Sequence, residues 1–497
     1  MLNKYDIVVY GGTAAGVIAA VQAIKMGKRT AIIEPSKRIG GLSSGGLGDT
    51  DTGDKSVIGG LSREFYTRLG SKYRKDEPVW LFEPKMALAV FQDFIKEYNI
   101  PVYYQERLSL IDGVLRSGDK IDRIMMESGK IFQASVFIDT SYEGDLMAKA
   151  GVTYTTGREA NRIYDETYNG IQTAVATKNQ LPSGIDPYRI KGDPSSGLLP
   201  NVHPKLEIVD GEGDNKIQAY CFRMCLTDNP DNRIMIDKPE GYDEQEYELL
   251  FRSIEAGQDI FFKLHMMPNR KTDSNNHNGF STDYIGMNYS YPEADYEERD
   301  RIIKAHEVYQ KSLVWTLQNH PRVPTEIQEF YKPWGLPKDE FTENGHWSPQ
   351  LYIRESRRML SEMVMNEHHI TLREPVLNPI GMGSYAMDSH NVQRHVDANG
   401  YVMNEGDVQI HLDKPYSISY DSIVPKEKEC SNLLVPVCLS SSHIAYGSIR
   451  MEPVFMVLGQ SAATAAVFAI EEEKSVQRID LTKLALRLQE DGQVLIQ

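Results

Sequence analysis

The first 35 residues combine two short apolar runs with one small-residue helix. Residues 7–10 (IVVY) and 30–33 (TAII) are continuous runs of the kind found in parallel strands that are buried on both faces. Between them, residues 17–26 are rich in Ala, Val and Ile and predict a helix, and Gly27 follows at the position of a left-handed cap. A strand, a helix and a second strand in this order predict a βαβ unit.

The remainder of the chain divides into three stretches with different patterns. Residues 157–375 are punctuated by Pro and Asn and enriched in aromatic and polar residues, which is typical of a domain with long ordered loops that carry substrate contacts. The pattern predicts helices at residues 61–69, at 84–98 and from about residue 452, short strands within 102–134 and after 377, a buried strand at 135–138, and an apolar segment at 432–438.

These elements predict an α/β fold with an insertion. Residues 1–156 form the N-terminal part of a Rossmann-like domain with three layers and a parallel sheet. Residues 376–497 return to complete that domain, and residues 157–375 form an inserted α+β substrate or cap domain.

A glycine-rich turn connects the first strand to the first helix. In the fingerprint G-x-G-x-x-G the first glycine makes the tight turn, the second lets backbone approach a pyrophosphate, and the third packs helix on strand. In GGTAAG, Gly11 and Gly16 fill the first and third places and Thr13 replaces the second. The helix N-terminus attracts phosphates, and Glu34 ends the second strand where a carboxylate accepts from ribose hydroxyls. Together they predict a dinucleotide site.

Three further segments indicate which dinucleotide is bound. Glu34 is followed by PSKRIGGL, in which paired glycines allow the backbone to lie against a cofactor. The strand at 135–138 runs into DTSYEGD, and SSSHIAYGSIRMEP precedes GQSAA near the C-terminus. These segments are similar to flavoprotein patterns in which the chain wraps the ADP ribose, passes the cofactor at a strand end and finally closes the FAD site.

With these motifs the chain resembles the FAD-dependent oxidoreductase family, in particular the bacterial branch whose cofactor domain is of the glutathione-reductase-2 and fumarate-reductase type. The resemblance implies FAD as cofactor, with the last helix directing its N-terminus at the pyrimidine end of the flavin. No second G-x-G-x-x-G unit follows, so a bound NAD(P)H is not expected. The implied FAD contacts are Gly11, Gly12, Thr13, Ala14, Ala15, Gly16, Glu34, Pro35, Ser36, Arg38, Gly40, Gly41, Leu42, Ser43, Gly46, Thr140, Ser141, Asp145, Ser442, His443, Gly459, Gln460 and Ala462.

Composition limits the partners. The formal charge is −16 over 497 residues, which argues against nucleic acid or an anionic membrane surface as the main partner. The N-terminus shows no signal peptide, and the apolar stretch at 459–470 is shorter than the about 20 residues of a membrane span. Four scattered cysteines without a CxxC pair predict buried free thiols and no zinc site. These observations favour a soluble, cytoplasmic protein.

Three residues are candidates for catalysis: His443, His390 and Arg354. Oxidation of an alcohol needs a base, and both histidines lie in segments expected near the cofactor, although each has a structural alternative. Arg354 and Arg358 are spaced to share one helical face, from which one arginine could orient a carboxylate, while surface ion pairs explain at least two of Arg354, Arg357 and Arg358. Arg450 is expected to pair with Glu452 or another nearby acid.

The polar loop containing Lys271, Asp273, Asn275 and His277 is a further candidate for the wall of the substrate pocket. Its spacing matches no established ligand set, so no metal is expected. The leading hypothesis is hydride transfer between a small polar substrate, a sugar-like alcohol or an organic acid, and flavin N5, with an unknown electron acceptor. The alternatives are reduction of an activated double bond and a carbohydrate lyase that keeps FAD in a non-redox role. Oligomeric state is left open.

Overall fold

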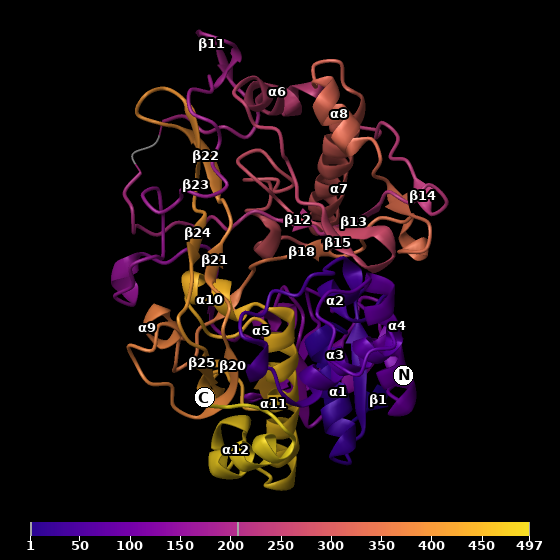
Figure 1. Cartoon of the computed structure of the whole chain (residues 1–497). Helices are drawn as coiled ribbons and strands as arrows, with labels where there is room; N and C mark the ends of the chain where they lie inside the picture. The colour runs from indigo at the N-terminus through magenta and orange to yellow at the C-terminus, as the bar shows by residue number, and fades with distance from the viewer. Residues whose placement is uncertain (1, 206–207, 497) are drawn as a thin grey trace.

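A five-stranded parallel sheet occupies the base of the molecule in the computed structural model, which describes residues 2–205 and 208–496 (Figure 1). The strand order is β26-β8-β2-β3-β4, and every neighbouring pair is parallel. Because β26 comes from the C-terminal part of the chain, both ends of the sequence build this sheet. Its strands are β2 (Ile7–Tyr10), β3 (Thr30–Glu34), β4 (Val102–Tyr104), β8 (Val136–Asp139) and β26 (Leu433–Leu434).

The central strand β2 is buried on both faces, as its apolar run predicts. Ile7 and Val9 pack into a core shared with helices α1 (Ala14–Lys25) and α11 (Glu452–Glu471). Val8 and Tyr10 point the other way, into a second core under a smaller sheet. The domain therefore has three layers, and the predicted α/β, Rossmann-like fold is confirmed. The smaller sheet contains β1 (Leu2–Lys4), β5 (Val114–Ser117), β6 (Lys120–Met125) and β7 (Ile131–Gln133).

The helices of this domain follow the predicted positions, with one instructive difference. Helix α1 begins at Ala14 rather than near residue 17, because the Thr13 hydroxyl caps it by accepting from the Gly16 amide at 3.3 Å. The other helices are α2 (Gly41–Gly45), α3 (Gly60–Lys72), α4 (Pro84–Glu97), α5 (Asp145–Lys149), α10 (His443–Ile449) and α12 (Leu481–Glu490).

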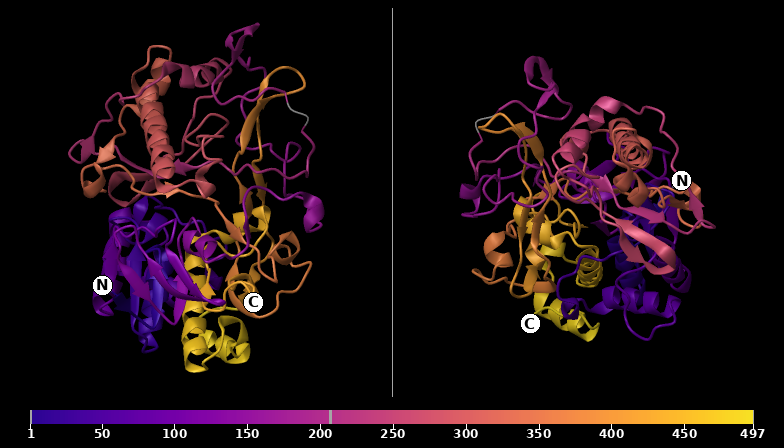
Figure 2. Two further views of the ribbon diagram at one scale, coloured as in Figure 1. Left: turned by 180° about the vertical axis from the view of Figure 1, so that it is seen from behind. Right: turned by 45° about the horizontal axis from the view of Figure 1, so that its top comes forward.

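The middle of the chain covers the upper half of the molecule, above the sheet domain (Figures 1 and 2). Its largest element, α7 (Tyr296–Asn319), stands upright over short antiparallel strands. The other α-helices and strands between residues 154 and 359 are β9 (Tyr154–Thr155), β10 (Tyr188–Ile190), β11 (Asp193–Leu198), β12 (Cys221–Phe222), β13 (Met224–Thr227), β14 (Arg233–Ile234), α6 (Glu248–Glu255), β15 (His265–Met267), β16 (Lys271–Ser274), α8 (Thr325–Tyr331), β17 (Leu336–Pro337), β18 (Leu351–Tyr352) and β19 (Arg358–Met359). Helix α9 (Glu367–Ile370) lies lower, near α10 (Figure 1).

Three antiparallel strand pairs connect the upper half to the C-terminal helices, and Figure 1 shows them rising beside α10. They join β20 (Pro379–Gly383) to β25 (Tyr416–Ser419), β21 (Met387–Ser389) to β24 (Val408–Ile410), and β22 (Gln393–Val396) to β23 (Val402–Glu405).

The long apolar helix α11 and the four cysteines all lie in the interior of the protein. Among the described residues, only α11 is long and apolar enough to span a membrane, and most of it is buried inside the protein against α1. All four cysteines are free and buried, which confirms that they are not disulfide staples.

Candidate functional site

The turn between β2 and α1 has room only for glycine at two positions. A Cβ on Gly16 would lie 2.0 Å from the carbonyl oxygen of Gly11 and 2.7 Å from the Thr140 hydroxyl. Gly11 itself has a φ of +99°, which L side chains rarely adopt, and a Cβ there would lie 2.7 Å from the Ser141 amide. The start of α1 is therefore held directly against the carboxyl ends of β2 and β8, where the helix dipole favours an anion.

The acid at the end of β3 is fixed by two backbone amides. Glu34 accepts from the amides of Gly12 and Ser36, each at 2.6 Å. Burial raises the pKa of this carboxyl, although the bonds from Ser36 and Gly12 oppose the shift. The remaining lone pairs of a carboxylate so held can accept from the hydroxyls of a ribose.

A pair of adjoining cavities opens over this turn. One, of about 310 Å³, is lined by Gly11, Thr13, Glu34 and Ser141 among others, and the second, of about 440 Å³, extends it along residues 35–38. A helix N-terminus, a glycine cradle and a ribose-binding acid in one hollow are the parts that a dinucleotide requires, so the residues present fit an ADP-containing cofactor.

The structure brings some of the predicted cofactor residues into these cavities and places others elsewhere. Those that line them are Gly11, Thr13, Glu34, Pro35, Ser36, Arg38, Gly41, Ser141 and Asp145. The remaining predicted residues do not line either cavity. They are Gly12, Ala14, Ala15, Gly16, Gly40, Leu42, Ser43, Gly46, Thr140, Ser442, His443, Gly459, Gln460 and Ala462. Their contacts with a cofactor stay predictions.

Three of these residues have clear structural partners in the protein itself. A Cβ on Gly459 would lie 2.4 Å from the Ala15 carbonyl oxygen, so this glycine permits the close packing of α11 on α1. Gln460 accepts from the Leu61 amide at 2.8 Å. The carboxylate of Asp145 pairs with Arg299 of α7 at 2.6 Å and with Arg357 at 2.7 Å, and it thereby ties the upper half to the sheet domain.

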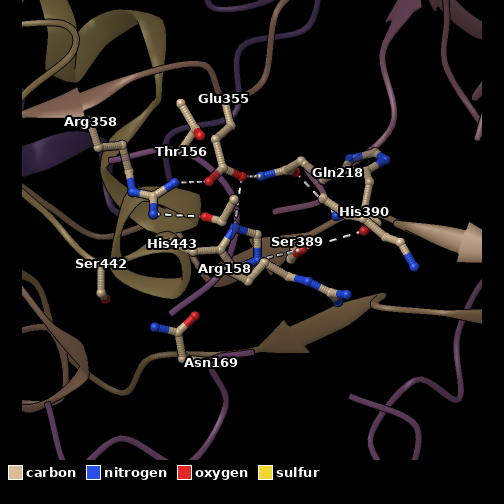
Figure 3. A network of polar contacts seen from close by, with 12 residues as sticks. Thr156, Arg158, Asn169, Gln218, Glu355, Arg358, Ser389, His390, Ser442 and His443 are labelled. Carbon is tan, nitrogen blue, oxygen red and sulfur yellow. Dashed lines mark hydrogen bonds and ion pairs between the residues drawn. The ribbon is translucent and has the colours of Figure 1, made fainter. Parts of the chain in front are cut away.

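His443 lies at the centre of a buried polar network (Figure 3). Its Nδ1 is 2.7 Å from Glu355 Oε2 and its Nε2 is 3.1 Å from the Ser389 hydroxyl, so both ring nitrogens have protein partners. The Glu355 carboxylate also binds Arg358 and accepts from the Gln218 amide. This arrangement fixes the orientation of the His443 ring, and its predicted part in catalysis stays a prediction.

Replacing His443 by Asn is therefore expected to destabilise the fold. The change leaves Glu355 with one buried partner fewer, which costs about 1–3 kcal/mol of unfolding free energy. Urea denaturation of the FAD-loaded protein measures this loss. The matched control is His411→Asn, because His411 is exposed and its replacement should stay within about 0.5 kcal/mol. Unchanged stability with lost activity would instead assign His443 to the chemistry.

His390 and Arg354 meet at a shared carboxylate. His390 Nδ1 lies 2.7 Å from Asp283 Oδ2, and Arg354 pairs with the other oxygen of Asp283 at 3.1 Å. The Nε2 atom of His390 is 3.6 Å from Asp388, beyond hydrogen-bond distance. Burial and the charge of Arg354 lower the pKa of His390, but Asp283 and Asp388 more than offset them, so its net pKa is raised.

The predicted helical face of Arg354 and Arg358 is wrong. Residues 353–357 form no helix, since β18 precedes them and β19 begins at Arg358. Surface ion pairs do not explain these arginines either: all three are buried, and Arg358 and Arg357 bind Glu159 and Asp145 respectively. Local spacing failed because the three guanidiniums are drawn to carboxylates distant in sequence. Arg450 pairs with Asp388 at 3.1 Å rather than with Glu452.

His390 faces a small polar cavity of about 140 Å³. This polar cavity is separated from the dinucleotide cavities by β18, whose two residues point to opposite sides: Leu351 lines the dinucleotide hollow and Tyr352 the polar cavity. The chain also runs from the dinucleotide loop through α2 to Asp49 and Asp51, which line the polar cavity. The two hollows are therefore neighbours.

The charges in the wall of the polar cavity largely neutralise one another. Arg223 binds Asp273 at 2.6 Å, and Arg450 binds Asp388 at 3.1 Å. Burial raises the pKa of Asp388, but the nearby His390 ring and the charge of Arg450 lower it to about 2. Apart from Lys263, the charged side chains of the wall have oppositely charged partners among the described residues. A ligand here therefore meets many hydrogen-bonding groups with little unpaired charge, which favours a neutral polar molecule.

Of the polar loop singled out in the sequence, two members lie in this wall. Asp273 and Asn275 line the cavity, whereas Lys271 is buried in ion pairs with Glu83 and Glu340. His277 does not line it. Within residues 2–205 and 208–496, no three His, Cys, Asp or Glu side chains are grouped to hold a metal ion.

Several residues of the site were not singled out from the sequence. Glu355 adjoins Arg354 and Asp388 lies two residues before His390, but these acids and Asp283 give no signal in the sequence of the residues with which they pair. Their roles depend on contacts such as Asp283 with His390, which lie 107 positions apart. Covariation between such positions is the signal that would have found them.

A family model covers almost the whole chain, whereas the similar solved structures are distant. The model of the family described as "FAD dependent oxidoreductase" matches residues 6–488. No curated protein matches the sequence. Among solved structures, a flavin-containing monooxygenase from Stenotrophomonas maltophilia is 18% identical, covering 32% of this chain and 43% of that chain, with a TM-score of 0.20. L-proline dehydrogenase from P. horikoshii is 16% identical, covering 32% and 59%, with a TM-score of 0.25. The chain thus spans less than two thirds of these proteins.

Proposed function

Because this chain belongs to the family of FAD-dependent oxidoreductases, we propose that it oxidises a hydroxyl-bearing carbon of a small, neutral, polyhydroxylated substrate held in the polar cavity. The observation that carries this proposal is the position of His390, whose ring lines that cavity and whose Nε2 has, among the described residues, no hydrogen-bond partner and only a 3.6 Å contact with Asp388. The paired charges of the wall support a neutral substrate over an organic acid.

The reaction needs an acceptor for a hydride and an acceptor for a proton. FAD, when bound, supplies a two-electron acceptor at its N5 atom. His390 accepts the hydroxyl proton at Nε2 as the C–H bond releases its hydride, and the alcohol becomes a carbonyl. Asp283 holds the Nδ1 proton and thereby fixes the tautomer that leaves Nε2 free, while Arg354 holds Asp283. In the network around His443, the Gln218 amide donates to Glu355, and the Gln218 amide oxygen accepts from the His390 backbone amide.

The experiment that tests this proposal is anaerobic titration of the FAD-loaded protein with sugars, polyols and organic acids, followed through the flavin absorbance. Bleaching by neutral polyols or sugars is expected. Flavin that no donor reduces, but that an enoate reoxidises after dithionite treatment, would replace the proposal with double-bond reduction. Consumption of a carbohydrate while the flavin stays oxidised would replace it with a lyase.

We propose that the enzyme works in the cytoplasm, which its four free, buried thiols support because a reducing compartment keeps cysteines unpaired.

A further inference from the structure

The polar cavity continues into two larger hollows. A cavity of about 340 Å³ shares Tyr385, Asp388 and Gln409 with it, and a third of about 240 Å³ shares residues 411–414 with the second. Each hollow has a residue of β24 in its wall, either Gln409 or Ile410. Strand β24 pairs with β21, which ends just before His390, and Figure 1 shows the two strands side by side. The three hollows thus adjoin in series from His390 to α9, and we call this series the groove.

We propose that the two outer hollows are a binding site for the second sugar unit of the substrate, so that the enzyme acts on a disaccharide or longer glycoside rather than on a free monosaccharide. This inference rests on the proposed function, because it places the reacting unit at His390. We call the two outer hollows the outer subsite.

Size is the first argument for the outer subsite. The polar cavity alone, at about 140 Å³, is smaller than the roughly 300–1,000 Å³ usual for ligand sites. The second hollow alone is more than twice as large and shares a wall with it. A substrate confined to the polar cavity would leave most of the volume of the groove unfilled. A ligand of two linked rings would extend from the polar cavity into the second hollow.

The chemistry of the outer walls is the second argument. His411, Asp413 and Lys414 are exposed and offer both donors and acceptors to a row of hydroxyl groups. Tyr385 and Leu412, both half-buried, supply apolar surface against which the C–H faces of a sugar ring can pack. Hydroxyl-binding groups beside apolar surface match a sugar, which has a polar rim and less polar faces.

Tyr385 lies at the junction between the polar cavity and the outer subsite. Its ring lines both the polar cavity and the second hollow, and its hydroxyl donates to Asp51 at 3.3 Å. Gln409 and Asp388 line the same junction. The linkage between two sugar units would therefore cross at Tyr385, with the reacting unit on the His390 side.

The test uses methyl α-glucoside, methyl β-glucoside, maltose, cellobiose and lactose as probes. Calorimetric titration of the FAD-loaded protein measures binding without turnover, and anaerobic flavin reduction measures the reaction. We expect at least one disaccharide to bind about tenfold more tightly than the corresponding methyl glucoside. The double variant His411→Ala/Asp413→Ala should remove this gain while methyl glucoside binding stays unchanged. Asp76→Ala, an exposed change away from the groove, is the matched control and should alter neither.

The outcomes separate the subsite from the reaction. A disaccharide preference that the double variant abolishes supports the outer subsite, even where no probe reduces the flavin, in which case only the proposed reaction fails. Flavin reduction with equal affinity for methyl glucosides and disaccharides overturns the subsite and leaves the reaction standing. Failure of every probe to bind overturns both.

Discussion

Replacing Gly16 by Ala should yield a protein that has largely lost FAD. The new Cβ would lie 2.0 Å from the Gly11 carbonyl oxygen and 2.7 Å from the Thr140 hydroxyl, and the first of these is backbone that cannot rotate away. The first turn of α1 must then shift from the end of β2, which moves the amides that meet the pyrophosphate. Overpacking of this kind costs about 1–3 kcal/mol, so FAD affinity should fall by about ten- to a hundredfold.

The ratio of flavin to protein absorbance after purification, followed by titration of the apoprotein with FAD, measures this loss. Gly27→Asn is the matched control, because Gly27 ends the same helix with a φ of +83° and a Cβ there would meet nothing within 4 Å. Asn tolerates that conformation, so the control should retain its FAD. Normal FAD affinity in Gly16→Ala would show that the cofactor does not depend on this turn.

The cofactor domain could be predicted from sequence because its signals are local. The apolar runs of β2 and β3, the glycine turn and Glu34 all lie within 28 residues, from Ile7 to Glu34, and each has a physical reason that depends only on its neighbours. The start of α1 was missed by three residues because Thr13 was considered only as a replacement for the second glycine of the fingerprint, whereas its hydroxyl caps the helix and donates to the Thr140 carbonyl.

The substrate side could not be predicted in the same way, since its contacts join distant segments. The spacing of Arg354 and Arg358 suggested a helix, but buried carboxylates hold both side chains on extended chain. His443 was favoured as a base because its segment returns to the cofactor domain, yet both of its ring nitrogens have protein partners. Asp283 gave no sequence signal, although it links two of the three catalytic candidates.

His390→Gln is expected to lower kcat by about 10²–10⁴-fold while FAD content stays unchanged. The variant removes the only proton acceptor proposed for the reaction, and the dinucleotide cavities do not include residue 390. Steady-state kinetics with the sugar that reduces the flavin most rapidly measure the loss. His277→Gln is the matched control, because His277 is a half-buried histidine of the upper half that does not line the polar cavity. An equal loss in both variants would contradict a specific role for His390.

The pH profile gives a second, independent readout of the same residue. Only neutral His390 accepts a proton, so kcat/KM should rise with pH through a midpoint above the ordinary histidine pKa of 6.5, because Asp283 and Asp388 raise the pKa. Since the folded-state pKa is raised, His390 also adds stability that is fully present below pH 6.5 and is lost as the pH rises through the folded pKa. Asp283→Asn removes one source of the shift and should move the kinetic midpoint to lower pH, whereas a purely structural role for Asp283 would lower activity at every pH without moving it.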